Sequence, residues 1–231
     1  MKVFSISDLH LDLNNTKPMN IFGPVWNNHT DKIISSWNEL VTDDDVVILA
    51  GDYSWAMKLE EVVPDFEFLN NLKGTKIIIR GNHDYWWSSL TKVREKLPKG
   101  VYALQNDAIK IGKYIFCGNR GWLIPEGKQN TEENKKIYAR EVIRAELSLK
   151  AAEKLKTDNE EIIFITHYPP FNNKVEPSEY TKLIESYGVS KVVFGHLHGY
   201  VNPKMIYNEI NGVKYYLTSC DAVKNQLVEI K

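Results

Sequence analysis

The stretch IIIRGNHDYWW, residues 77–87, combines an apolar run with an abrupt change to small and polar residues. Three consecutive isoleucines are typical of a strand that is buried on both faces. Residues 81–84 then present glycine, an amide, an imidazole and a carboxylate, before three aromatic residues follow. A simple turn would use glycine and asparagine but would not need histidine and aspartate next to them. The stretch therefore predicts a buried strand that delivers chemically active side chains at its carboxyl end.

Four further apolar runs end in a similar way. They are VFSIS before Asp8, VVILAG before Asp52, IIFIT before His167 and VVFG before His196. All are short, rich in valine and isoleucine, and barely alternate between apolar and polar residues, as expected of strands covered on both faces. Helical patterns lie between several of them, at residues 30–40, 58–74 and 177–188. This alternation of strands and helices predicts an α/β fold.

One long helix and two hairpins complete the predicted elements. The helix covers residues 131–155, with Thr131 as its N-cap and a buried stripe along one face. The stripe consists of Tyr138, Val142, Ala145, Leu149 and Ala152. The hairpins turn at Gly112-Lys113 and at Asn211-Gly212, and QLVEIK forms a last strand. Residues 14–30 are predicted to form a loop.

Composition limits the classes of protein that the chain can represent. Its 231 residues include 29 Lys and Arg against 30 Asp and Glu, so it lacks the basic excess that favours nucleic acid as a partner. Cys117 and Cys220 are too few for a disulfide framework, although one bridge between them stays open. No apolar run approaches the roughly 18 residues of a membrane span. We expect a single domain over residues 1–231, in a soluble cytoplasmic protein without a membrane partner.

The side chains at the five strand ends share one chemistry. Open α/β sheets bind ligands just beyond the carboxyl ends of their strands, so these groups are expected to meet in one crevice. Five of the six histidines fall in the motifs, and only His29 lies elsewhere. Each motif alone could be a structural turn, but a purely structural explanation of all five together is disfavoured. Seven side chains are candidate ligands: Asp8, His10, Asp52, Asn82, His167, His196 and His198.

Oxygen and imidazole ligands without thiolate suit manganese, iron or zinc rather than calcium. Seven side chains are too many for one tetrahedral ion. They suit two divalent ions if one carboxylate bridges them, an arrangement that can clamp the attacking and leaving oxygens of a phosphoryl displacement. The sequence therefore predicts a dinuclear metal centre at one edge of the sheet.

In this order, the motifs resemble the calcineurin-like metallophosphoesterase superfamily, in its single-domain bacterial type. The resemblance extends from Asp8 to His198, and all five blocks are present. It implies a four-layer α/β/β/α sandwich, in which two mixed sheets are flanked by helices. It also implies how the ligands divide: Asp8, His10 and His198 for one metal, Asn82, His167 and His196 for the other, and Asp52 as the bridge.

The same resemblance implies a hydrolytic enzyme whose metal-bridging hydroxide attacks phosphorus. His83 would protonate the leaving oxygen or stabilise the transition state, and Asp84 would orient its imidazole. Tyr85, Trp86 and Trp87 follow directly. Such rings are more often core than substrate contacts, so we expect two of the three in the core. Tyr85 and Trp86 are the candidates for a contact with substrate.

The sequence differs from some branches of the superfamily, and these differences indicate which class of substrate to expect. Ser/Thr protein phosphatases of the superfamily carry Val-Asp-Arg-Gly after the second Gly-Asp, whereas YSWAM follows Asp52 here. The missing arginine favours a small phosphodiester or nucleotide over a phosphomonoester. Arg120, at a glycine-flanked turn, is a candidate to bind the phosphate in its place, and a surface arginine is the alternative. We expect substrate selectivity to lie in residues 14–30, 53–58 and 119–130.

Three other functions stay open at this point. A phosphomonoesterase or protein phosphatase would need another cation for its substrate. A DNA nuclease of the superfamily would fit poorly with balanced charge. A non-catalytic scaffold with the same fold would be expected to have lost metal ligands, but every ligand position and His83 are intact. A serine hydrolase is disfavoured because no G-x-S-x-G motif occurs.

Overall fold

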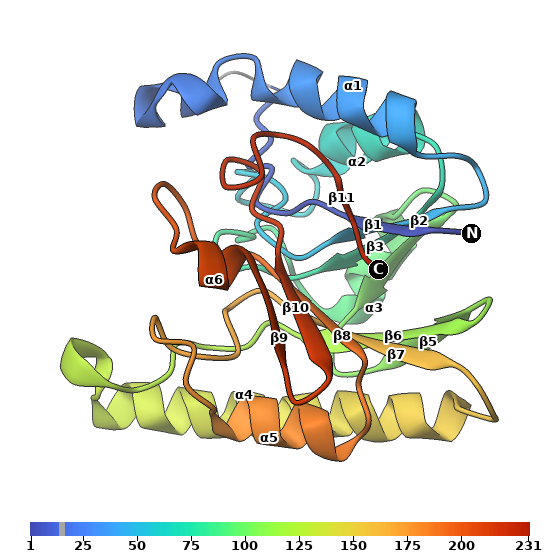
Figure 1. Ribbon diagram of the computed structural model, residues 1–231. Coiled ribbons are helices and arrows are strands. Elements are labelled where there is room, and N and C mark those ends of the chain that lie inside the picture. Colours follow the sequence, from blue (N-terminus) through green and yellow to red (C-terminus); the bar gives the residue numbers. More distant parts are fainter. Residues whose placement is uncertain (14–16) are drawn as a thin grey trace.

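The computed structural model describes residues 1–13 and 17–231, in which two sheets lie face to face (Figure 1). Within these residues the first sheet has five strands in the order β11-β1-β2-β3-β4. Its strands are β1 (Val3–Ser5), β2 (Val46–Leu49), β3 (Thr75–Ile79), β4 (Val101–Leu104) and β11 (Val228–Glu229). Neighbours from β1 to β4 are parallel, and only β11 runs antiparallel, beside β1.

The second sheet has six strands over the same residues, in the order β5-β6-β7-β8-β10-β9. They are β5 (Ala108–Ile111), β6 (Tyr114–Asn119), β7 (Glu161–Thr166), β8 (Lys191–Phe194), β9 (Tyr207–Ile210) and β10 (Val213–Leu217). The four central strands are parallel, and the two edge strands are antiparallel to their neighbours. Both sheets are therefore mixed.

Helices cover the outer faces of both sheets (Figure 1). On the first sheet lie α1 (His29–Leu40), α2 (Val63–Asn70) and α3 (Leu90–Lys96), and on the second lie α4 (Glu132–Leu155) and α5 (Glu179–Ser186). A short α6 (Pro203–Ile206) precedes β9, and single 3₁₀ turns form η1 (Met19–Phe22), η2 (Pro24–Trp26) and η3 (Gly127–Gln129). The four-layer sandwich implied by the resemblance is confirmed.

Three apolar layers explain why the strand sequences do not alternate. One core lies between the sheets and includes Ile48, Ile77, Ile163 and Val193. A second lies under α1 to α3, and a third lies under α4 and α5. Each central strand therefore has apolar neighbours on both faces, and strands of this kind read as continuous runs of valine and isoleucine.

Helix α4 follows its sequence pattern closely. The Thr131 side chain accepts a hydrogen bond from the Asn134 amide at 3.1 Å, which confirms it as the N-cap. Tyr138, Ala145, Leu149 and Ala152 are buried, while Val142 is partly buried. The predicted stripe thus faces the second sheet.

Both predicted hairpins form with two-residue turns. Ile111 pairs with Tyr114, and Ile210 pairs with Val213. Asn211 and Gly212 both have positive φ, 52° and 79°, which is the conformation that a type I′ turn requires at both central positions.

Some boundaries differ from the sequence prediction. The helix expected over residues 58–74 is restricted to α2, because Pro64 occupies its first turn and disfavours helix before it. The predicted loop contains η1 and η2 and ends at α1, and its residues 14–16 lie outside the described residues. Strand β4 has no counterpart among the predicted strands. Cys117 and Cys220 are both free and buried, so no bridge joins them.

The helices were compared with the length and hydropathy that a membrane span requires. Over residues 1–13 and 17–231, none of them is both long and apolar enough to cross a bilayer.

Two leucines of α4 provide a matched test of this packing. Leu149 is completely buried, whereas Leu147 is 53% exposed. Leu149→Ala should lower the free energy of unfolding by about 2–5 kcal/mol, because it leaves a cavity under the second sheet. Leu147→Ala should change it by less than about 0.5 kcal/mol. Urea unfolding measures both, and equal effects would contradict the assigned face of α4.

Candidate metal centre

The carboxyl ends of five parallel strands carry the candidate ligands to one edge of the molecule. The motifs after β1, β2 and β3 come from the first sheet, and those after β7 and β8 come from the second. Asp8, Asp52 and His167 are completely or almost completely buried, and His10 is 3% exposed. The ligands are therefore held between the two sheets rather than on a flexible surface.

One set of ligand atoms comes from Asp8, His10 and His198. Single atoms from these three residues lie within 4.8 Å of one another. The Nε2 atom of His198 is 3.5 Å from Oδ1 of Asp8. This is the set expected for the first metal.

A second set meets at Asn82. Its Oδ1 atom lies 2.8 Å from Nε2 of His167 and 2.9 Å from Nδ1 of His196. Atoms of Asp8, Asp52 and His167 also lie within 4.8 Å of one another, so the two sets are adjacent.

Asp52 lies between the sets. Its Oδ2 atom is 3.4 Å from Nε2 of His167 and 3.9 Å from Nε2 of His10. The structure therefore brings all seven predicted ligands together, with Asp52 in the intermediate position.

The backbone is strained at four of these ligands. Asp8, His10, Asp52 and His196 all have positive φ, between 45° and 73°. Residues other than glycine rarely adopt this conformation, although aspartate and histidine tolerate it better than most. Each costs on the order of 1–3 kcal/mol, and such residues concentrate at functional sites.

Two glycines allow the ligand loops to approach each other. A Cβ atom on Gly81 would collide with the side chain and amide nitrogen of Asp52, and one on Gly195 would collide with the Asp8 carboxylate. Neither position has space for any other residue, so both glycines of the motifs have a steric role.

The protonation states suit metal ligands. Burial lowers the pKa of His10 to about 3 and that of His196 to about 3, so both imidazoles are neutral at neutral pH and can bind a cation. For His167 burial also acts to lower the pKa, but the charge of Asp52 outweighs it and raises the pKa to about 9. The same carboxylate that attracts a proton here would attract a metal ion.

Unpartnered polar atoms also fit a cation site. Within the described part of the chain, the buried atoms His10 Nδ1 and Asp52 Oδ2 have no hydrogen-bond partner. Buried polar atoms without partners are costly and rare in native proteins. Together with the donor chemistry, they support a fit of these residues to divalent cations.

Asp221 supports the centre from outside, and sequence reasoning missed it. Its Oδ1 atom is 2.9 Å from Nδ1 of His198, and its Oδ2 accepts from the Gly199 amide at 2.9 Å. Burial acts to raise the pKa of Asp221, but these bonds outweigh it and lower the pKa. A carboxylate behind a ligating imidazole fixes the ring orientation. The signal was present, because Asp221 follows the strand now identified as β10.

Asp84 does not orient His83 as expected. It is completely buried and accepts hydrogen bonds from the backbone amides of Gly81 at 2.7 Å, Asp52 at 2.9 Å and Tyr53 at 2.8 Å. It also accepts from the Ser54 amide and from Nε1 of Trp86. Burial raises its pKa to about 6 despite these donors. The carboxylate thus joins the loop after β2 to the loop after β3.

His83 is positioned by aromatic rings instead. Its ring centre lies 5.0 Å from that of Trp55 and 6.1 Å from that of Tyr85. Its backbone amide donates to Oδ1 of Asp52 at 2.7 Å, which ties its position to the centre.

The three aromatics after Asp84 separate into two environments. Trp86 is 1% exposed and Trp87 is 4% exposed, and both belong to the core beneath α1 to α3. Trp86 therefore cannot contact substrate, because its ring is used in packing and its nitrogen in binding Asp84. Tyr85 is 52% exposed and stays available beside His83.

Arg120, the candidate phosphate contact, follows β6. Its guanidinium lies 5.0 Å from the ring centre of Trp122, and it lines a small cavity that contains none of the seven candidate ligands. A contact of Arg120 with a phosphate at the metals stays a prediction.

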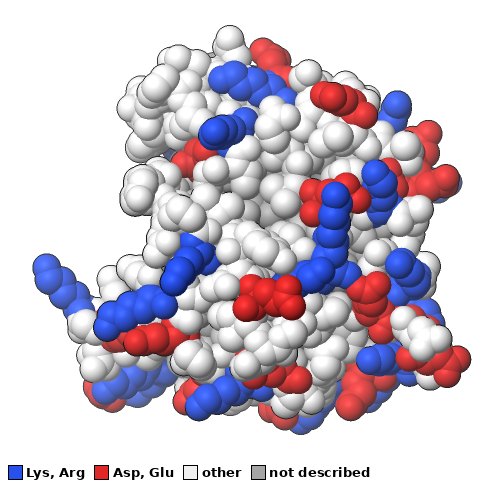
Figure 2. All heavy atoms as spheres, in the orientation of Figure 1, with Lys and Arg blue, Asp and Glu red and all other residues white. Residues whose placement is uncertain are grey.

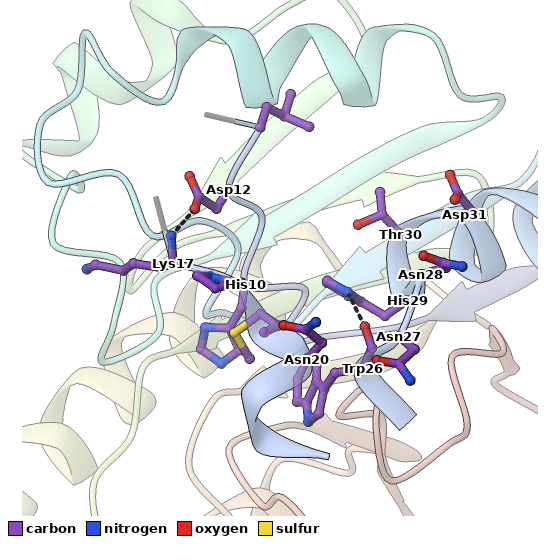
Figure 3. Close-up of a pocket in the computed structure, with 13 residues that line it drawn as sticks. His10, Asp12, Lys17, Asn20, Trp26, Asn27, Asn28, His29, Thr30 and Asp31 are labelled. Carbon is purple, nitrogen blue, oxygen red and sulfur yellow. Dashed lines mark hydrogen bonds between the residues drawn. The ribbon is translucent and has the colours of Figure 1, made fainter. Parts of the chain in front are cut away.

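Two larger cavities adjoin His10. One, of about 510 Å³, is largely apolar and is lined by Met19, Phe22, Trp26 and Trp55 together with His83 and His198. The other, of about 610 Å³, is lined mainly by residues 17–31 (Figure 3).

His29, the histidine outside the motifs, supports the loop between these cavities (Figure 3). Its ring nitrogens contact the carbonyl oxygens of Trp26 at 3.2 Å and Leu9 at 3.0 Å. It therefore connects the segment before α1 to the loop that carries His10.

Comparison with known proteins identifies the family. Residues 1–200 match the family model of calcineurin-like phosphoesterases. The chain belongs to the calcineurin-like phosphoesterase family. This confirms the resemblance, and it makes the protein a member of a family of metal-dependent phosphoester hydrolases whose metal ligands are of the types gathered here.

A solved structure agrees in fold. This calcineurin-like phosphoesterase is similar to a protein of unknown function from Aquifex aeolicus, with 11% identity and a TM-score of 0.52, over 99% of this chain and 95% of that one. A structure of a novel archaeal phosphodiesterase matches over 100% of both chains, with 17% identity and a TM-score of 0.44. A search of curated proteins finds no match.

Replacing the Asp84 carboxylate should damage the metal centre. Asp84→Asn would place an amide nitrogen against backbone N–H groups, and we expect a loss of stability of about 3 kcal/mol and weaker manganese binding. Thermal unfolding and calorimetric titration with manganese measure the two effects. The exposed Asp158→Asn is the control. Normal stability and metal binding with reduced turnover alone would support the original interpretation, in which Asp84 orients His83.

Asp221 should act on metal affinity rather than on folding. Asp221→Asn removes the carboxylate that holds His198, and we expect manganese affinity to fall about 10–100-fold with an unchanged far-UV spectrum. Titration calorimetry on the chelator-treated protein measures this change. Unaltered affinity would mean that the bond from His198 to Asp221 has no supporting role.

Proposed function

We propose that this calcineurin-like phosphoesterase uses two divalent metal ions, of manganese, iron or zinc, to hydrolyse a small phosphodiester or nucleotide. The observation that carries the proposal is the convergence of seven oxygen and imidazole ligands, including Asp52 between the two sets. A scaffold would have no need to retain this complete and strained arrangement.

The residues would divide the metals as the family pattern implies. Asp8, His10 and His198 would hold one ion, Asn82, His167 and His196 the other, and Asp52 would bridge them. When bound, two such ions polarise the phosphoryl oxygens and make water a nucleophile at neutral pH. The ligands come from two rigid sheets, so they are held in place before substrate binds.

His83 would supply the proton for the leaving oxygen. It is not among the ligands, yet its amide is bonded to Asp52 and its ring lines the 510 Å³ cavity. A leaving group seated in that cavity would therefore depart next to an imidazole. A positioned general acid of this kind contributes about 10²–10⁴-fold to rate.

The walls of this cavity favour an organic ester group. Trp26, Trp55 and Phe22 provide flat apolar surfaces, and Trp55 stacks on His10 with 4.6 Å between ring centres. A planar group such as a nucleoside could stack there. The loop after Asp52 also carries no arginine, which supports a diester over a more highly charged monoester.

Surface charge supports a small substrate over nucleic acid. Figure 2 shows basic and acidic side chains interspersed on the face in view. The overall balance of 29 basic and 30 acidic residues agrees with this distribution. A long phosphate backbone would be bound more effectively by a continuous basic surface.

Metal removal and ester choice test the proposed function. The protein is treated with chelator, reloaded with manganese and assayed on bis-p-nitrophenyl phosphate and on p-nitrophenyl phosphate. We expect diester cleavage to return with metal and to exceed monoester cleavage. Full activity without metal would contradict the proposal, and monoester cleavage alone would overturn the diester preference.

Two substitutions separate the roles in the same assay. Asp52→Ala should lose both bound metal and turnover. His83→Ala should keep its metal but lose turnover by about 100-fold or more, as expected when a general acid is removed. If His83→Ala bound no metal while still folded, its role as an acid would be wrong.

A further inference from the structure

A second polar cavity lies at the same edge of the sheets as the metal centre. It has a volume of about 80 Å³, and three arginines contribute to its wall. Its lining consists of Arg80, Leu104, Gln105, Asn106, Arg120, Glu141 and Arg144. Leu104 ends β4, and the other residues follow β3, β4 or β6 or lie on α4. The cavity, which we call the arginine cavity, is thus also built at the carboxyl ends of parallel strands.

The charges around the arginine cavity are not balanced. Glu141 is buried and forms an ion pair with Arg144. Over the described residues, the side chains of Arg80 and Arg120 take part in no ion pair. Three arginines against one glutamate leave a charge of 3 − 1 = +2 around this small volume.

Arg80 is the costliest of these groups to bury without a bound anion. Its Nε atom is buried and lacks a hydrogen-bond partner within the described chain. A half-buried guanidinium beside a second one is costly unless an anion compensates for both.

We propose that the arginine cavity binds a phosphate group. A phosphate carries a charge of about −1.5 to −2 at neutral pH, which matches the excess of positive charge. The planar fork of arginine binds phosphate through two parallel hydrogen bonds. The phosphate is either free inorganic phosphate or the terminal phosphate of a substrate; only the second source rests on the function proposed above.

The arginine cavity is connected to the metal centre through the backbone. The carbonyl oxygen of Arg120 accepts hydrogen bonds from the amides of His167 at 3.0 Å and Tyr168 at 3.1 Å. The ring of Tyr168 in turn lies 4.2 Å from that of His196, centre to centre. Arg80 precedes the ligand Asn82 by two positions. A phosphate in the cavity would therefore contact residues whose backbone positions the ligands.

Phosphate binding by the manganese-loaded protein tests the proposal. Titration calorimetry with inorganic phosphate should detect a site that Arg80→Gln and Arg120→Gln each weaken by about tenfold or more. A phosphate bound at the metals should be unaffected by these changes. The matched control is Arg140→Gln, which removes the same charge from an exposed position on α4. This variant should bind phosphate as the wild type does.

Stability provides a second readout that does not depend on catalysis. Inorganic phosphate should raise the Tm of the wild type more than that of Arg80→Gln or Arg120→Gln, because a ligand stabilises only the folded protein that binds it. Without phosphate, Arg80→Gln should unfold at no lower temperature than the wild type. Equal phosphate affinity and equal Tm shifts in all four proteins would overturn the proposal.

Two substrates distinguish the sources of the phosphate. A 5′-phosphorylated dinucleotide is compared with its unphosphorylated counterpart, and bis-p-nitrophenyl phosphate serves as a diester without a second phosphate. If the terminal phosphate occupies the cavity, Arg80→Gln should raise KM only for the phosphorylated dinucleotide. If free phosphate is the ligand, the binding difference should appear without any KM difference. If the wild type cleaves no diester, the proposed function is refuted, but the proposal that the arginine cavity binds phosphate is not.

Discussion

The buried carboxylate of Asp84 holds together two of the loops that carry candidate metal ligands. It accepts hydrogen bonds from the amides of Gly81, Asp52 and Tyr53, and thus joins the loop after β2 to the loop after β3. Asp52 and Asn82, two of the candidate metal ligands, lie in these loops. Without a common acceptor, three buried amides would lack partners, and the loops would separate. The position of Asp52 therefore depends on Asp84, which lies outside the two candidate ligand sets.

The candidate metal centre combines a strained backbone with a concentration of charged groups. Asp8, His10, Asp52 and His196 have a left-handed backbone, and over the described residues buried atoms of His10 and Asp52 lack hydrogen-bond partners. Such an arrangement is unfavourable in isolation and is supported by the surrounding sheets. Cations bound by these atoms would compensate for the missing partners.

Acidic and basic groups lie in separate sites along this edge of the molecule. The metal centre gathers carboxylates and neutral imidazoles, whereas the arginine cavity gathers uncompensated guanidinium groups. The first environment attracts cations, and the second attracts anions. Both open where parallel strands end, and the backbone of Arg120 bonds directly to that of His167. A phosphoester substrate with a second phosphate would match both environments at once.

The sequence alone was sufficient for the architecture and for the convergence of the candidate ligands. Unbroken valine and isoleucine runs indicate strands covered on both faces, and the residues after them must meet at one edge because parallel strands end on the same side. The meeting of Asp8, Asn82 and His167 could be predicted in this way because it depends on local position, shortly after a strand. The helix face of Leu149 was equally predictable, because helical periodicity is local.

Only the tertiary structure determined what depends on partners distant in sequence. Asp84 lies next to His83 but bonds to amides about 30 positions away, and Asp221 reaches His198 from the loop after β10. Arg120, which follows a strand of the second sheet, lines the same cavity as Arg80, which follows a strand of the first. Sequence neighbours suggest contacts, but a buried polar group bonds to whichever donors the packed chain places around it. The candidate ligands can be predicted from where the strands end, whereas the residues that support them are identified only from tertiary packing.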